Sequence, residues 1–254
     1  MVVGANGRLH RFKFTQEDSD NHPGMRVLDH IGVYDQIRAQ GFAHDYGSLV
    51  NIKGEPIGKL VLGSEELYGF PAVRLFRNSL RQVLLEEASR QGIEIRYGMR
   101  AVKVSNETDD SVSLVFENGE PVRADLVIGA DGMNSCIREY ISPGQTPKYT
   151  GQTVVIGFAK KSSIRGNEEV DSTKMILGTG GSFAMMPADG ISGQIMFFST
   201  VETHDRTKEE WHEFNRVKQG LKDFLRDPFS KEPWPDVVRG LVSDTPAETF
   251  FCWP

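Results

Sequence analysis

An apolar run that breaks into a glycine-flanked acid is the feature that most constrains this 254-residue chain. The stretch from Ala124 to Tyr140 reads ADLVIGADGMNSCIREY, and residues 126–128 within it form a short continuous apolar run. Such a run predicts a strand that is buried on both faces, as in a sheet that helices cover on both sides. Gly129 and Gly132 on either side of Asp131 predict a sharp turn, at which the backbone can approach a ligand closely.

The chemistry of this turn suits a ligand site. An acid at a strand end can accept hydrogen bonds from sugar hydroxyls or from ordered water. Asn134 or Ser135 can cap the helix that follows, whose free N–H groups suit a phosphate, and Arg138 offers a second anion partner. A Gly-Ala-Asp-Gly turn is also common in parallel sheets that bind nothing, so these residues alone leave a ligand site and a structural turn equally open.

Composition excludes some classes of protein and favours others. The formal net charge of −6 and the absence of a basic stripe with interleaved aromatics argue against a nucleic-acid partner. The two cysteines, Cys136 and Cys252, have neither metal-ligand spacing nor the pattern of a disulfide framework, so we expect no metal and a reducing, cytoplasmic setting. No apolar run approaches the roughly 20 residues of a membrane-spanning helix, so we expect a soluble protein.

The N-terminal segment, residues 1–24, is expected to be irregular. It opens with MVVGANG, which resembles the start of a nucleotide-binding strand and turn. A dinucleotide-binding unit needs a GxGxxG turn, an apolar helix and a second strand that ends in an acid. Only Gly4 and Gly7 are present, and charged and turn-forming residues follow them. We therefore interpret the glycine pair as incidental.

Residues 25–150 alternate between helical and strand patterns. The pattern predicts a helix, a turn at Gly32 and a second helix over residues 25–42, then one or two strands over residues 46–62. It next predicts a helix that Asn78 or Ser79 caps and Gly92 ends, followed by strands at 93–97, from 102 and at 111–117, and a turn at 118–119. Arg77 precedes this helix, where the helix dipole does not favour a cation, so either an anionic ligand or a structural ion pair would explain it.

Residues 151–254 form a second, mostly β module. Residues 153–160, 174–179 and 182–200 predict antiparallel strands with short turns, and the spacing of apolar residues predicts one amphipathic helix over 208–224. A short helix is expected over 236–242. The chain ends on the apolar sequence FFCWP, from which we expect that part of a larger fold is missing.

Three segments together resemble a known family. RVLDHIGVYDQI, LFRNSLRQVLLEEA and ADLVIGADGMNSCIRE are similar to the flavoprotein aromatic hydroxylases, FAD-dependent monooxygenases related to salicylate hydroxylase. The resemblance implies an α/β (α+β) fold, with an incomplete FAD-binding Rossmann-like domain over residues 25–150 and a β-sheet substrate domain over residues 151–254. It also implies FAD as cofactor, NADH or NADPH as reductant and a small aromatic substrate.

The resemblance assigns roles to four residues. Arg77 matches the arginine that lies along FAD, near its ribityl and phosphate groups. Asp131 and Gly132 match the turn that supports FAD and contributes to contact with the nicotinamide cofactor, and Arg138 helps to hold that turn. No catalytic side chain is identified, although Phe158, Tyr149 and His204 lie in or near the substrate module; a lone Tyr or His there is more often structural.

The chain also departs from the family pattern. It lacks the GxGxxG turn that receives the FAD pyrophosphate and the GDAAH block that contacts the ribityl chain, so it resembles a fragment truncated at both ends. Loss of the first turn should weaken FAD binding severely. A non-catalytic remnant that binds a ligand or partner therefore remains an alternative. A plain NAD-dependent dehydrogenase is disfavoured, because the GADG turn follows a hairpin rather than a first glycine-rich βαβ unit.

Overall fold

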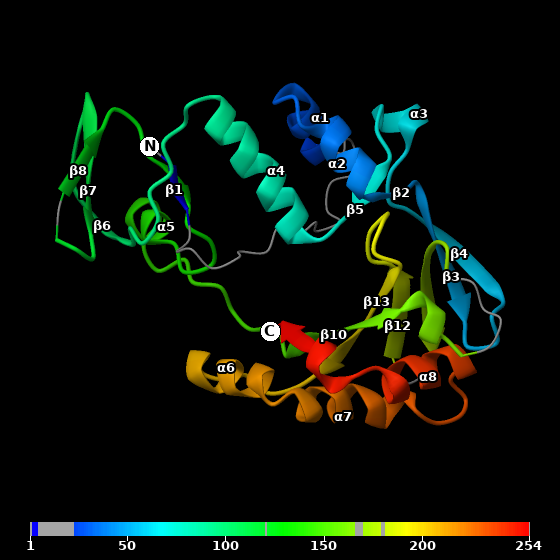
Figure 1. Ribbon diagram of the computed structural model, residues 1–254. Coiled ribbons are helices and arrows are strands. Elements are labelled where there is room, and N and C mark those ends of the chain that lie inside the picture. The colour runs from blue at the N-terminus through cyan, green and yellow to red at the C-terminus, as the bar shows by residue number, and fades with distance from the viewer. Residues whose placement is uncertain (1, 5–22, 120, 166–169, 179–180, 254) are drawn as a thin grey trace. The chain divides into compact units, whose positions relative to one another are not determined.

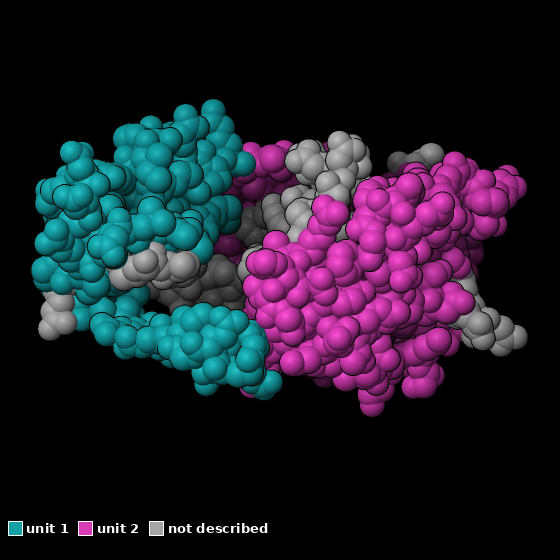
Figure 2. Space-filling model, turned by 90° about the horizontal axis from the view of Figure 1, so that it is seen from above, with its two compact units in different colours: residues 1–15, 85–148 teal, residues 16–84, 149–254 magenta. Residues whose placement is uncertain are grey.

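The chain folds into two compact units. A computed structural model describes every residue except 1, 5–22, 120, 166–169, 179–180 and 254. Unit 1 comprises residues 1–15 and 85–148, and unit 2 comprises residues 16–84 and 149–254 (Figure 2). The second division lies close to the domain boundary expected at residue 150. Residues 25–84, which we assigned to the FAD-binding domain by resemblance, pack with the C-terminal sheet.

The described residues of unit 1 form two small sheets, one short helix and the end of a longer helix that begins in unit 2. β1 (Val2–Gly4) and β9 (Ile128–Ala130) pair in parallel, whereas β6 (Ala101–Thr108), β7 (Ser111–Phe116) and β8 (Pro121–Ala124) form an antiparallel sheet in sequence order. α5 (Cys136–Ile141) follows β9. The buried core consists of Leu114, Phe116 and Ile137. The predicted strand pair and its hairpin turn at 118–119 are confirmed.

Three expectations for unit 1 were wrong. Residues 93–97 form no strand, and no described strand pairs with them, so Ile93 and Tyr97 are 56% and 59% exposed. The strand before Asp131 is not buried on both faces, since Ile128 is 52% exposed and β9 has only β1 as a described neighbour. Residues 2–4 form β1 inside the segment expected to be irregular, and Gly7, the second of the two glycines interpreted as incidental, lies outside the described residues.

The first part of unit 2 is a small helical layer with a two-stranded ribbon. α1 (Pro23–His30) and α2 (Tyr34–Gln40) confirm the predicted helix, turn and helix, with Gly32 at φ +78° between them. β2 (Phe42–His44) pairs with β5 (Ala72–Arg74), and α3 (Glu65–Tyr68) is a single turn. α4 (Arg77–Arg90) begins slightly earlier than predicted and continues across the boundary between the units. The buried core of this layer consists of Met25, Leu28, Val33, Ile37, Val73, Leu80 and Val83.

A seven-stranded sheet forms the centre of unit 2 (Figure 1). Its order is β14-β10-β13-β12-β11-β3-β4. The strands are β3 (Tyr46–Asn51), β4 (Pro56–Val61), β10 (Gln152–Lys160), β11 (Thr173–Gly178), β12 (Gly181–Pro187), β13 (Gln194–Glu202) and β14 (Phe251–Trp253). The predicted antiparallel strands are confirmed. The sequence did not predict that β3 joins them through a parallel pairing with β11.

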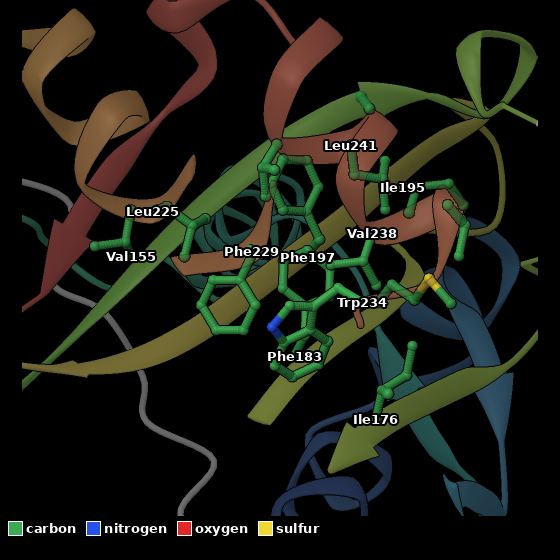
Figure 3. Packing of buried hydrophobic residues seen from close by; sticks show 14 of the residues in the cluster. Val155, Ile176, Phe183, Ile195, Phe197, Leu225, Phe229, Trp234, Val238 and Leu241 are labelled. Atoms are coloured by element: carbon green, nitrogen blue, oxygen red, sulfur yellow. The ribbon is translucent and has the colours of Figure 1, made fainter. Parts of the chain in front are cut away.

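Helices cover one face of this sheet. α6 (Lys208–Arg216), α7 (Lys218–Phe229) and α8 (Asp236–Asp244) follow β13 in the chain, and single 3-10 turns lie at Lys161–Ser163 and Ala247–Thr249. Phe183 and Phe197 of the sheet pack with Phe229 and Trp234 in the core shown in Figure 3. The prediction of one helix over 208–224 was wrong, because the backbone of Val217, with ψ 78°, separates α6 from α7. The short helix expected near 236–242 is confirmed.

The strand register assigns side chains to the two faces of the sheet. Val155 lies opposite Cys252 and Ser199, and belongs to the helix-covered core. Ile156 lies opposite Phe198 and Phe251 on the other face, because successive side chains in a strand alternate. We call this other face the second face; it consists of Val154, Ile156, Phe158, Met175, Ala184, Met186, Met196, Phe198, Phe251 and Trp253.

Candidate functional site

The turn between β9 and α5 depends on two glycines. A Cβ at Gly129 would lie 2.6 Å from Cβ of Ile137, so only glycine lets α5 pack against β9 at this distance. Gly132 has φ +79°, in the left-handed region that side chains other than glycine adopt with strain. The strand, sharp turn and helix predicted for this block are therefore present, although the strand begins at Ile128 rather than Leu126.

Both carboxylate oxygens of Asp131 accept hydrogen bonds from the turn itself. Ser135 Oγ donates to Oδ1 at 2.5 Å, and the backbone N–H of Cys136 donates to Oδ2 at 2.8 Å. Burial acts to raise the pKa of Asp131, but these hydrogen bonds outweigh it and lower the pKa below its usual value. Burial and the neighbouring Asp131 carboxylate raise the pKa of the Cys136 thiol. Asp131 thus stabilises the turn as an ionised carboxylate.

Arg138 holds the same turn from the helix side. Its guanidinium donates to the carbonyl oxygens of Gly132 at 3.3 Å, Gln145 at 3.2 Å and Met133. Its backbone N–H donates to Ser135 Oγ at 2.9 Å, which confirms Ser135 as the helix cap. Because Asp131 and Ser135 already accept N–H groups of the first turn, we no longer expect those groups to be free for a phosphate. These hydrogen bonds stabilise the turn without a ligand.

Arg77 belongs to unit 2 and is the first residue of α4. Its guanidinium carbon lies 4.8 Å from the centre of the Trp253 ring, a cation–π contact between α4 and β14. Burial lowers the pKa of Arg77. The structure therefore brings Asp131, Gly132 and Arg138 together in unit 1, whereas Arg77 lies on the second face of the sheet in unit 2.

A row of aromatic rings continues from Arg77 across the second face. Phe76 lies 5.5 Å from Phe158, Phe158 stacks at 5.8 Å on Phe251, and Phe251 meets Trp253 edge to face at 5.8 Å, all between ring centres. Phe158, Phe251 and Trp253 remain partly exposed. This surface has the apolar and aromatic character that suits a planar organic ring.

The other aromatic and histidine candidates have structural contacts. The Tyr149 hydroxyl donates to the Thr203 carbonyl at 3.2 Å, and its ring packs 5.6 Å from that of Trp211. The carbonyl of His204 accepts a hydrogen bond from Arg206 at 3.1 Å. Tyr149 thus contacts α6 through Trp211, and His204 lies in the segment just before α6.

A second partly buried arginine, Arg74 on β5, was not predicted from the sequence. Its Nη2 group donates to Thr173 Oγ1 at 3.0 Å and to His44 Nε2 at 3.2 Å, and Nη1 donates to the Pro187 carbonyl at 3.3 Å. Burial lowers the pKa of Arg74 to about 10. No sequence signal could have revealed this cluster, since its members come from β2, β5, β11 and β12 and meet only after the sheet has formed.

The described part of the chain has neither a cluster of metal-ligating side chains nor a helix that could cross a membrane. No three His, Cys, Asp or Glu side chains there gather in a way that could hold a metal ion. None of the helices described above is both long and apolar enough to cross a membrane.

The mixed α/β fold and the sequence together identify a flavin-binding class of protein. The sequence matches the FAD binding domain family over residues 17–240, and the chain belongs to that family. The resemblance to FAD-dependent aromatic hydroxylases is therefore confirmed, as is the α/β (α+β) fold class.

Curated relatives carry monooxygenase names. The chain is 32% identical over 181 residues to 3-amino-4-hydroxybenzoate 2-monooxygenase of Streptomyces cremeus, which covers 70% of this chain and 44% of the relative. It is 27% identical over 170 residues to salicylate hydroxylase of Pseudomonas putida, which covers 61% of this chain and 38% of the relative. The chain thus spans less than half of the length of these two relatives.

Solved structures share the fold. HpxO of Klebsiella pneumoniae, crystallised with FAD and uric acid, superposes with a TM-score of 0.71 at 22% identity, covering 91% of this chain and 56% of HpxO. PqsL of P. aeruginosa superposes over the whole of this chain and 66% of its own, with a TM-score of 0.67 at 17% identity.

Proposed function

We propose that this chain is the FAD- and substrate-binding part of a monooxygenase that hydroxylates a small aromatic molecule with NADH or NADPH and O2. Family membership supports FAD, and the names of the relatives, which act on hydroxybenzoate or salicylate, support an aromatic substrate. The nicotinamide reductant follows from the resemblance alone. The cysteines form no disulfide, which agrees with the cytoplasm as the proposed compartment.

Each unit, considered by itself, has described residues with features that suit FAD. Arg77 presents a partly buried cation that suits a phosphate group or a polar ribityl chain. Gly132 has no side chain to obstruct a ligand at a turn that Asp131 and Arg138 stabilise. When bound, FAD would supply the redox chemistry, which no protein side chain provides. The residues that follow β1, where the family places its pyrophosphate turn, lie outside the described part.

The protein would contribute position and a dry surface. The second face of the sheet can hold an aromatic ring against Phe158 and its neighbouring rings, and its apolar side chains would exclude water from the reacting atoms. The observation that carries this proposal is the position of Arg77. The residue that the family pattern directs at FAD lies beside the aromatic row on which a substrate ring would rest.

Retention of flavin tests this proposal. The purified chain would be mixed with FAD and passed through a gel-filtration column, and the visible absorbance that elutes with protein would be measured. We expect bound flavin in the wild type, and at least tenfold weaker binding in Arg77→Met, because a charge-assisted contact to FAD is lost. Arg81→Met is the matched control, since Arg81 is exposed one turn further along α4.

Two results would contradict the proposal. If the wild type elutes without flavin at saturating FAD, the chain is better described as a ligand- or partner-binding remnant. If Arg77→Met and Arg81→Met bind FAD equally well, Arg77 is not a cofactor residue. If the wild type retains flavin, oxidation of NADH or NADPH by the flavin-loaded chain in the presence of salicylate would identify the reductant.

A further inference from the structure

Two methionines are paired across neighbouring strands on the second face of the sheet. Met196 of β13 lies directly opposite Met186 of β12 on one side and directly opposite Phe158 of β10 on the other. Side chains that lie opposite each other in antiparallel strands share one face, with Cβ atoms about 4.5–5.5 Å apart. The thioether of Met196 therefore lies between the side chain of Met186 and the ring of Phe158, which belongs to the aromatic row.

The methionines of β12 and β13 differ in their exposure to solvent. Met185 belongs to the helix-covered core and is fully buried, and Met186 is only 4% exposed. Met196 is half-buried, as is the neighbouring Phe158, so part of each side chain is open to water and to molecules of similar size. The strand register thus leaves one accessible thioether directly beside a ring on which we propose that a substrate rests.

A thioether reacts with hydrogen peroxide, whereas the ring of a phenylalanine does not. The sulfur attacks one oxygen of the peroxide, so that an S–O bond forms and the O–O bond breaks. The proton on the transferred oxygen passes to the departing oxygen, which leaves as water. Sulfur is oxidised by two electrons and the peroxide is reduced by two. A polar sulfoxide thus replaces an apolar side chain.

A sulfoxide on Met196 would change the chemistry of the aromatic surface. A ligand ring that rests on Phe158 would cover the new oxygen atom, and a polar group that loses water without gaining a hydrogen bond disfavours binding. The favourable contact between a thioether sulfur and the edge of a ring would also be lost. Oxidation of this one residue would therefore weaken the binding of aromatic molecules.

We propose that Met196 is a site of reversible oxidation by hydrogen peroxide, and that its sulfoxide lowers the affinity of the second face for aromatic molecules. This inference rests on the proposed function, since it describes a regulation of the same substrate surface. Methionine sulfoxide reductases reverse the modification: the sulfoxide oxygen leaves as water, and a dithiol is oxidised to a disulfide. Met196 thereby makes the binding of aromatic molecules depend on the level of peroxide.

Site-resolved mass spectrometry tests the oxidation itself. The full chain would be exposed to a series of hydrogen peroxide concentrations, and the sulfoxide fraction of each methionine would be measured. We expect Met196 to oxidise about tenfold faster than Met185 and Met186, because the reaction follows the exposure of the thioether. Equal rates at Met196 and Met185 would overturn the inference.

The binding of salicylate tests the consequence. Its dissociation constant would be measured by calorimetry before oxidation, after oxidation, and after treatment with methionine sulfoxide reductases and dithiothreitol. We expect the constant to rise about tenfold as Met196 is converted to the sulfoxide, and to return after reduction. After the same peroxide treatment, Met196→Leu should keep its own affinity, whereas Met99→Leu should lose affinity as the wild type does. Met99 is the matched control, since it is a half-buried methionine of unit 1.

The wild-type series needs no variant, so the test remains valid if Met196→Leu fails to fold. A wild type that binds no salicylate, or one whose affinity is unchanged once Met196 is oxidised, would overturn the inference. So would a folded Met196→Leu variant that loses affinity as much as the wild type. Flavin retention is measured separately, so a chain that keeps FAD and binds salicylate equally well after oxidation refutes this inference and not the proposed function.

Discussion

Asp131 acts first on its own turn. Its two oxygens accept from Ser135 and from the N–H of Cys136, so the acid that the sequence suggested as a ligand contact is also the residue that shapes the loop. A carboxylate has about four lone-pair sites, so these bonds leave room for a further donor such as a sugar hydroxyl. The structural and the functional interpretations of the turn are therefore compatible.

Replacement of Asp131 by Asn should loosen this turn. The amide side chain has the same size, but its NH2 group would face either the Ser135 hydroxyl or the Cys136 N–H, and both of these groups donate hydrogen bonds to Asp131. One hydrogen bond would be lost, so the free energy of local unfolding of α5 should fall by about 1–3 kcal/mol. Hydrogen exchange of the Cys136 and Arg138 amides measures it. Asp125→Asn, at an exposed position before β9, is the charge-matched control and should change neither amide.

The stabilisation of the turn by Asp131 should depend on pH. Because the folded-state pKa of Asp131 is lowered, its stabilisation is complete above the unfolded-chain pKa of about 3.9 and fades as pH falls through the folded value. The difference between wild type and Asp131→Asn should therefore shrink in acid. A difference that stays constant from neutral pH to pH values below the folded pKa would show that the ionised carboxylate is not responsible.

Trp253 should act as a positioning residue for Arg77. Its ring supports the guanidinium at 4.8 Å, and a cation–π contact between partly exposed groups contributes about 0.5–1 kcal/mol, so Trp253→Leu should weaken FAD binding about two- to fivefold. Trp253→Phe should restore most of the affinity. Trp211→Leu removes the ring beside Arg206, which lies 4.7 Å away, and provides a control with a similar contact outside the site. Equal losses in the Trp253→Leu and Trp211→Leu variants would indicate a general loss of stability instead.

At the level of elements, local signals were sufficient for helices and hairpins. Gly32 and Gly92, both with positive φ, follow α1 and α4 as the sequence predicted, because a glycine after an apolar periodic run ends a helix by itself. The break at Val217 was missed, since the apolar spacing continues from Phe214 to Leu221 across it. The strand expected at 93–97 was wrong because strand formation needs a partner, and none of the described strands provides one.

Two glycine substitutions should change stability in opposite directions. Gly129→Ala would place a Cβ 2.6 Å from that of Ile137, which must push α5 away and cost about 1–3 kcal/mol. Gly220 lies inside α7, where an added Cβ would meet only Val217 at an ordinary 3.4 Å, so Gly220→Ala should stabilise the helix by about 0.5–1 kcal/mol. Denaturant titrations that follow each unit separately would measure both. A neutral Gly129→Ala variant would disprove the close packing of α5 on β9.

At the level of the whole molecule, the sequence motifs identified the family but only some residues of the candidate site. Arg77 and the Asp131 turn could be found because each lies in a short continuous segment. Arg74 could not, since Thr173 and Pro187 reach it only through the pairing of β11 with β12 and β3. The grouping of residues 25–84 with the C-terminal sheet was missed for the same reason. Contacts between segments far apart in the sequence, unlike a motif, produce no recognisable pattern within a single segment.

The two units should differ in stability. The buried cluster of unit 2 includes Phe183, Phe197 and Phe229, each almost fully buried, whereas that of unit 1 consists of three residues. Burial of apolar area is the main source of stability, so backbone amides of β12 and β13 should exchange with solvent at least tenfold more slowly than those of β7. Mass spectrometry of exchanged peptides would measure this. Equal protection of β7 and β13 would show that the units unfold together.

The parallel pairing of β3 with β11 also affects how the chain is made. Ser48 and Thr173, joined across it by a hydrogen bond, lie 125 positions apart. At a synthesis rate of roughly 5–20 residues per second, the β3–β4 hairpin waits roughly 6–25 s for its partner to leave the ribosome. Throughout that time one edge of β3 has unpaired backbone groups, which other chains can bind. Translation speed between these two strands should therefore influence the yield of correctly folded protein.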